Sequence, residues 1–322
     1  MIKNIIFLAI FLNLFLSLQA QSDIGFNLLN NRYKPAFGFS AGYENLRINE
    51  IVYLTENCEN LASKIDWNPG TLFSLGLSIS LSPTDNLKSF GFFIEGRTKH
   101  YFQMVEGWQT DRDWDNEGRE LSFGYSPVNM VSGMENAGSA GIIISIKNKF
   151  GFDIFFEVMH KRYVLMAYDG YVEQDGLIYD LYGPTIQYFQ EWFLMGGGIQ
   201  ARYGIRRVKL NINYSILPFI RGANIDYHYF RKNDINNQQE MFLSFEDYVR
   251  GGMYQKIGAS VDININSNLT MTVFTEYESV QGSRGKTFIK TRGINNYEVW
   301  YSNTAGAGMS GFKAGVRAEV RL

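Results

Sequence analysis

The sequence predicts an all-β protein, a ten-stranded antiparallel transmembrane β-barrel that extends beyond the outer membrane. Two observations carry this prediction: apolar and polar residues alternate with a period of two over long stretches, and short polar turns alternate with long polar excursions. The composition agrees, since 25 Phe, 20 Tyr and 32 Gly occur with 6 Pro, a mixture that suits strands more than helices.

Residues 1–20 are typical of a secretory signal peptide. Lys3 precedes an apolar run that ends at Leu18, and the small residue Ala20 is followed by polar residues. No later run is apolar over about 18 residues, so no transmembrane helix is expected. No linker or low-complexity tract divides the remainder, so we expect residues 21–322 to form a single barrel domain.

The charge and the cysteine content exclude two further features. A net charge of −2 gives no basic footprint, so no nucleic-acid partner is expected. Cys58 is the single cysteine of the chain, so an intramolecular disulfide is impossible.

The clearest alternation occurs in the last segment of the chain. Phe312 and Val316 lie on one side of the predicted strand, whereas Lys313 and Arg317 lie on the other. Residues 257–278 contain two more segments of this kind. A soluble β-sandwich is the alternative, and it would point its apolar face inward. The predicted signal peptide, the long segments and the unequal loops favour the barrel.

Ten such segments follow one another, and an even number is what bacterial outer-membrane barrels require. Many exceed the roughly 9–11 residues needed to cross a bilayer, so the excess is expected to project beyond the membrane on the side of the long loops. The segments lie roughly at 32–55, 60–82, 87–112, 121–147, 151–172, 181–204, 206–230, 242–266, 269–285 and 297–322. The long excursions are expected near 110–135, 166–185, 222–245 and 280–300.

Two short groupings of ionisable residues are candidates for chemistry. Asp111 and Asp113 form one, and Asp226 and His228 form the other, with a spacing of two residues that puts both side chains on one face of a strand. Asp111 shares the odd parity of charged Glu95, so the acidic pair is expected to face the lumen. If the two strand ends meet, three carboxylates and an imidazole share one pocket, which is sufficient to activate a water for hydrolysis.

The seventh segment does not keep one parity throughout. Leu210 is apolar and expected to face outward, yet Asp226 has the same even parity. A bulge or register break is therefore required between them, and Pro218 or Gly222 is suited to supply it.

The chain resembles the omptins, outer-membrane endoproteases of Gram-negative bacteria. The resemblance rests on residues 50–54, 62–67, 111–114 and 226–229, which occur in the order of the omptin motifs, and it spans nearly all of the mature chain. The combination of Asp-x-Asp-Trp with Asp-x-His-Tyr is specific, whereas either part alone is weak. It implies a bacterial outer-membrane protein that cleaves peptides or proteins through a groove facing the extracellular side. We expect a monomer.

The resemblance also implies the roles of the four residues. The matches to Asp111 and His228 flank a nucleophilic water in that family. The match to Asp226 holds and polarises the histidine, and Asp113 completes the acidic pair. Direct attack by water requires no covalent intermediate, and no metal or other cofactor is expected.

Substrate and lipid contacts follow from the same resemblance, with two departures. Omptins favour cleavage between basic residues and hold the first with two acids; Glu50 matches one, but neutral Asn224 stands at the other, which leaves dibasic selectivity open. Omptins also require lipopolysaccharide, so this lipid is the expected activator and partner. Arg162 matches a contact to lipid A phosphate, whereas Glu191 stands where a second arginine is expected.

Four alternatives stay open. A catalytically silent barrel would act as an adhesin or binding protein, which the altered pocket and lipid positions favour. Ser122 with His228 and Asp226 would form a serine-protease arrangement, although no nucleophile-elbow glycine pattern surrounds Ser122. The acid and histidine set would also hold a cation. A small passive pore is disfavoured, because charges of both signs inside ten strands are expected to plug the lumen.

Overall fold

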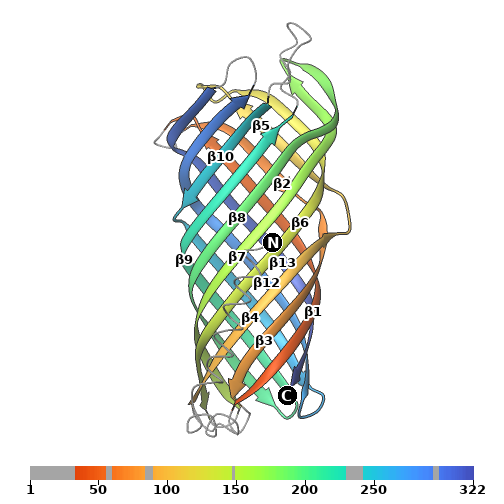
Figure 1. The fold of residues 1–322 in the computed structure, drawn as a ribbon, viewed down its shortest axis with the longest axis vertical. Helices are drawn as coiled ribbons and strands as arrows, with labels where there is room; N and C mark the ends of the chain where they lie inside the picture. The colour runs from red at the N-terminus through yellow and green to blue at the C-terminus, as the bar shows by residue number, and fades with distance from the viewer. Residues whose placement is uncertain (1–32, 56–59, 84–89, 147–148, 230–241, 293–296) are drawn as a thin grey trace.

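The computed structural model describes residues 33–55, 60–83, 90–146, 149–229, 242–292 and 297–322. In these ranges the chain forms one antiparallel sheet of thirteen β elements, and the pairing of the first strand with the last closes the sheet into a barrel (Figure 1). The predicted signal peptide lies outside the described residues. Within the described residues, no helix has the length and hydropathy to span a membrane.

Thirteen β elements make ten barrel strands, because three pairs of elements continue one another. The elements β2 and β3 pair with successive parts of β1, β4 and β5 with successive parts of β6, and β10 and β11 with successive parts of β9. The predicted count is therefore confirmed for the described residues. The elements are β1 (Tyr33–Tyr53), β2 (Leu61–Asn68), β3 (Thr71–Pro83), β4 (Phe90–Gln103), β5 (Gly107–Trp114), β6 (Glu120–Ile146), β7 (Phe150–Gln174), β8 (Leu177–Ile205), β9 (Val208–His228), β10 (Phe242–Arg250), β11 (Met253–Asn264), β12 (Leu269–Arg292) and β13 (Tyr297–Arg321).

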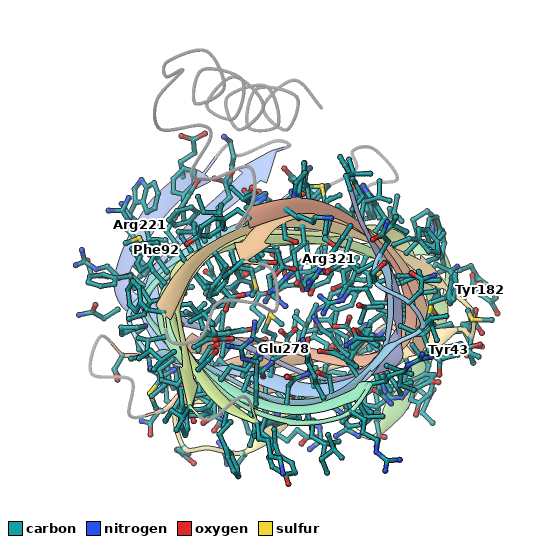
Figure 2. The ribbon with its side chains drawn as sticks, turned by 90° about the horizontal axis from the view of Figure 1, so that it is seen from below. Tyr43, Phe92, Tyr182, Arg221, Glu278 and Arg321 are labelled. Atoms are coloured by element: carbon teal, nitrogen blue, oxygen red, sulfur yellow. The ribbon has the colours of Figure 1, made fainter. Side chains whose placement is uncertain are left out.

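Many large apolar side chains of the strands lie exposed on the outer face, which is the arrangement of a membrane barrel and not of a soluble sandwich. Phe92 and Ile212 are 57% and 62% exposed, and Figure 2 shows Tyr43 and Phe92 outside the ring and Glu278 inside it. Beyond Tyr43, the next outward residues of β1 include exposed Arg47. The apolar belt therefore ends near this level, and the strands continue past it.

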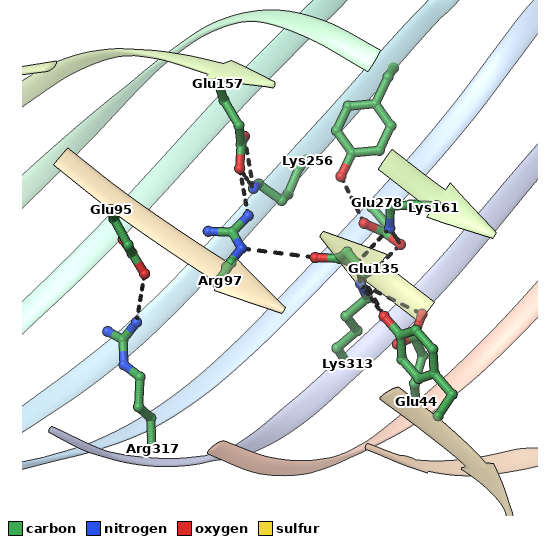
Figure 3. Close-up of polar contacts among 12 residues, drawn as sticks. Glu44, Glu95, Arg97, Glu135, Glu157, Lys161, Lys256, Glu278, Lys313 and Arg317 are labelled. Atoms are coloured by element: carbon green, nitrogen blue, oxygen red, sulfur yellow. Dashed lines mark hydrogen bonds and ion pairs between the residues drawn. The ribbon is translucent and has the colours of Figure 1, made fainter. Parts of the chain in front are cut away.

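The lumen contains a network of paired charges (Figure 3). Lys161 and Lys313 contact both Glu135 and Glu278, and the side chains of all four are at most 4% exposed. Lys313 Nζ lies 2.8 Å from Glu135 Oε2 and 3.1 Å from Glu278 Oε1. Each buried charge thus has opposite charges beside it, which offsets the cost of desolvation. A second group in the same figure consists of Arg97, Glu157 and Lys256.

The predicted break in parity on β9 is present. Between the pairs Met195–Phe219 and Gly197–Ile216, β9 contains one residue more than β8, so a β-bulge includes Pro218. Proline suits this place because it has no N–H to donate to the neighbouring strand. Even-numbered residues of β9 face outward before the bulge and inward after it, which confirms the expectation.

A second break lies on the other edge of β9, at the same height. There the partner strand changes from β11 to β10 across Gly251 and Gly252. Both glycines have positive φ, 70° and 79°, a conformation that side chains other than glycine rarely adopt. The two breaks together reorient the wall formed by β9 and β10 above the membrane belt.

The excursion expected near 166–185 is a hairpin and not a loop. The strand β7 continues to Gln174 and β8 begins at Leu177, with the turn at Asp175 and Gly176 in positive φ. The polar composition misled the prediction, because a strand beyond the membrane has no lipid-facing side and shows no apolar alternation. We call the end of the barrel that carries β2, β5 and β10 the distal end; the C-terminus lies at the other (Figure 1).

Candidate active site

Asp226 and His228 form a buried pair on the distal half of β9. His228 Nε2 lies 2.7 Å from Asp226 Oδ2, and the two residues are 8% and 1% exposed. The backbone N–H of Phe245 on β10 donates to the other oxygen, Asp226 Oδ1, at 3.0 Å. The ring of Phe245 also packs edge-on against the imidazole, at 5.5 Å between centroids. The carboxylate is thus fixed from both sides and orients the imidazole.

Asp111 and Asp113 lie on β5, at the same end of the barrel, with the inward parity that the sequence predicts. Both are half-buried. Ser63 Oγ donates to Asp111 Oδ1 at 3.4 Å, and Ser122 Oγ donates to Asp113 Oδ2 at 2.8 Å. The hydroxyl of Ser122 therefore belongs to the acidic pair, which speaks against its use as a nucleophile with His228.

The two walls that carry these groups meet through an aromatic stack. Trp67 on β2 stacks on Tyr188 on β8, with centroids 4.9 Å apart and an interplanar angle of 17°. Trp67 is the cross-strand neighbour of Gln109, the inward residue before Asp111, and Tyr188 is the neighbour of Asp226. The stack spans the lumen one step below the acidic pair and joins the two walls that carry the predicted groupings.

Glu50 lies on β1, in the same cross-strand row as Asp111, with Ile65 between them. Its side chain is 2% exposed and lies above the apolar belt. Burial raises the pKa of Glu50 well above its usual range, and the negative charges of Asp226 and Asp247 raise it further. Glu50 therefore faces acidic groups from β9 and β10 as well as from its own wall.

Asn224 and Asp247 are direct cross-strand neighbours on β9 and β10. They are 1% and 0% exposed. Burial raises the pKa of the Asp247 carboxyl to about 7. Sequence analysis missed Asp247. It follows Glu246, and an acidic dipeptide places one residue on each face of a strand, so the pattern alone does not indicate which acid enters the site.

Arg162 does not join this group. It lies exposed on the outer wall of β7, where its cross-strand neighbour is Glu191 on β8. Glu191 Oε1 is 2.6 Å from His160 Nε2, so the acid that replaces an expected arginine has a partner on the same outer face. No group of three or more His, Cys, Asp and Glu among the described residues is arranged to hold a metal ion.

Fold and site together define an outer-membrane β-barrel with an acid and histidine site at its distal end. The model of the omptin family matches residues 33–318, and the chain belongs to the omptin family.

The solved structure of the outer membrane protease OmpT from Escherichia coli is similar, with a TM-score of 0.77 at 16% identity over 90% of this chain and 97% of that chain. This similarity shows the fold. A FadL homologue of Pseudomonas aeruginosa aligns at a TM-score of 0.30 with 9% identity over 89% of this chain and 90% of its own. Neisserial surface protein A aligns at 0.30 with 9% identity over 89% and 99%. The search of curated proteins gave no match.

Proposed function

We propose that this omptin is an outer-membrane endopeptidase that hydrolyses peptides or proteins outside the cell with a water activated between Asp111 and His228. Family membership and the similarity to a structure described as an outer membrane protease support the protease class. The observation that carries the mechanism is the buried Asp226–His228 pair, 2.7 Å apart, on a wall facing the acidic pair.

The Asp226 carboxylate sets the tautomer of the base. When Asp226 Oδ2 accepts the proton of Nε2, the other ring nitrogen, Nδ1, is the one that takes a proton from water. The water oxygen then attacks the carbonyl carbon of the scissile peptide bond. The proton held by His228 passes to the leaving amine as the carbon–nitrogen bond breaks, so the products are a carboxylate and an amine.

Asp111 and Asp113 act from the opposite wall. Asp111 accepts a hydrogen bond from the attacking water and aims its lone pair away from the acid. Asp113 holds the end of β5 through its bond with Ser122. Because the attack uses water, no acyl-enzyme forms, and the Ser122 hydroxyl has no nucleophilic role.

The substrate and lipid contacts complete the proposal. Glu50 and the amide oxygen of Asn224 contact the basic side chain before the scissile bond, since both are buried acceptors next to the acid and histidine pair. Arg162, exposed on the outer wall, contacts a lipid phosphate, with lipopolysaccharide as the activating lipid. The enzyme acts as a monomer.

The test is digestion of a mixed peptide library by the refolded protein, with and without lipopolysaccharide, with cut sites identified by mass spectrometry. We expect cuts after basic residues that require the lipid. Intact cells that display the protein should cleave added peptide, since the site faces outward. Binding of peptides without any cut would instead support the silent adhesin or binding protein.

A further inference from the structure

A buried carboxylate that the proposed mechanism does not use lies on the wall opposite Glu50. Asp247 is 0% exposed, and the polar groups beside it are the carboxyl of Glu50 and the hydroxyl of Thr287. Its outward neighbour on β10, Glu246, is bonded to Tyr248 instead. Ionisation of a carboxyl that is buried beside a second acid is costly, and a bound cation would offset that cost.

Two other buried side chains near Asp247, those of Glu50 and Asn224, also present acceptor atoms. The Oδ1 and Nδ2 atoms of Asn224 are buried without a hydrogen-bond partner among the described residues, and Glu50 is 2% exposed. Asp247 and Asn224 are cross-strand neighbours, and the carboxyl groups of Glu50 and Asp247 lie close enough to share a proton. Three side chains from three strands, β1, β9 and β10, thus present acceptors to one small region.

We propose that Asp247 supplies the second acid that Asn224 lacks, so that Glu50, Asp247 and the Asn224 amide oxygen hold the guanidinium of a substrate arginine. The proposal rests on the endopeptidase function and names a specificity residue for it. Asp247 on β10 is the cross-strand neighbour of Asn224 on β9, so the two positions are about 5 Å apart at the same height of the barrel. An acid at position 247 therefore places its charge in the same region as an acid at position 224.

The chemistry of the acceptors favours arginine over lysine. A guanidinium has five N–H donors in a planar fork and remains charged at all physiological pH values, whereas an ammonium is a compact point charge with three donors. Two carboxylates and an amide oxygen from three strands can accept hydrogen bonds from several N–H groups of one planar guanidinium. Arginine binding also exchanges the proton shared by Glu50 and Asp247 for a permanent cation.

The experiment compares two peptides that differ only before the cut, where one has arginine and the other has citrulline, its neutral isostere. For the refolded full-length protein, Asp247→Asn should lower the ratio of kcat/KM for arginine to that for citrulline by about tenfold or more, as expected for loss of a charged hydrogen bond. The matched control is Glu246→Gln, which removes the adjacent outward-facing charge and should leave the ratio unchanged.

A charge relocation separates pocket chemistry from structural damage. In the double variant Asp247→Asn/Asn224→Asp, the acid moves to the neighbouring strand, and the arginine preference should return. The proposal would be overturned if Asp247→Asn left the ratio of kcat/KM for arginine to that for citrulline unchanged. It would also be overturned if kcat/KM fell equally for both peptides and the double variant did not restore it.

A failure of the endopeptidase function gives a different result. If wild-type protein cuts neither peptide with or without lipopolysaccharide, fluorescence anisotropy of the labelled peptides still measures binding. If the arginine peptide binds more tightly than the citrulline peptide, and Asp247→Asn weakens that binding, the cation pocket is supported and the endopeptidase function is refuted. Equal binding of both peptides would discard the pocket.

Discussion

Trp67 and Tyr188 stack across the lumen, 4.9 Å between centroids, and join the wall of Asp111 to the wall of Asp226. Both rings are almost fully buried. Because Trp67 is the neighbour of Gln109, two residues before Asp111, and Tyr188 is the neighbour of Asp226, their contact fixes the separation of the two walls. The proposed catalysis by Asp111 and His228 depends on this separation, since small displacements of reacting groups are costly.

Trp67→Ala should therefore lose both stability and activity. Removal of a buried Trp side chain from a packed lumen costs about 3–5 kcal/mol of unfolding free energy. We expect the residual folded barrel to have a lowered kcat, because the walls are no longer held apart at a fixed distance. Urea unfolding in detergent micelles and single-turnover cleavage measure the two effects. Trp300→Ala, which removes a half-exposed ring stacked on Phe288, should cost much less unfolding free energy and leave kcat unchanged.

Asp226→Asn should impair the base with little effect on folding. The amide still accepts from the Phe245 N–H, but it no longer stabilises the charged imidazole or selects its tautomer. We expect kcat to fall by about 10²-fold or more with KM nearly unchanged. Heat-modifiable migration in gels checks that the barrel is folded. A variant that retains the wild-type kcat would remove Asp226 from the mechanism.

The Asp247 carboxyl predicts a pH dependence of stability. Its folded-state pKa is raised to about 7 by burial, above the usual value near 3.8. The native protein therefore keeps a proton that the unfolded chain releases, and the unfolding free energy falls as the pH rises from about 4 to about 7. Asp247→Asn does not have this pH dependence. Relative to the wild type, its unfolding free energy should therefore be higher by up to about 4 kcal/mol at pH 8 than at pH 4. If the unfolding free energies of the wild type and Asp247→Asn changed with pH in the same way, Asp247 would not be the group responsible.

The charge network of the lumen predicts a large penalty for loss of one partner. Glu135→Gln removes one carboxylate from the buried ammonium groups of Lys161 and Lys313. We expect a loss of about 3–5 kcal/mol of unfolding free energy, as found for broken buried ion pairs. Glu117→Gln, which breaks an exposed pair with Arg119, should be silent. Equal unfolding free energies for the two variants would contradict a stabilising role of the buried charge network in the lumen.

The barrel itself could be predicted from the sequence because lipid on one side and charges on the other enforce a strict period of two. The conflict between Leu210 and Asp226 even located the bulge, which the structure places at Pro218. The period has no meaning where both faces of a strand meet water. The hairpin around Asp175 and Gly176 was therefore expected as a loop.

From the sequence, only those residues of the candidate site could be predicted that form a recognisable local motif. Asp111 with Asp113 and Asp226 with His228 have that spacing, and the fold brings them to facing walls. Asp247 has none, because its relation to Asn224 is a cross-strand register between β9 and β10. The stack of Trp67 on Tyr188 is a contact across the lumen, which no local pattern contains.

The central claim, that Asp111 and His228 act on one water, is tested most directly by the cleavage rates of Asp111→Ala, His228→Ala and the double variant in folded barrels. Residues that act as a unit lose the same activity singly or together. We predict that all three variants have the same residual rate on an arginine peptide. Full activity in either single variant, or losses that multiply in the double variant, would contradict the shared water.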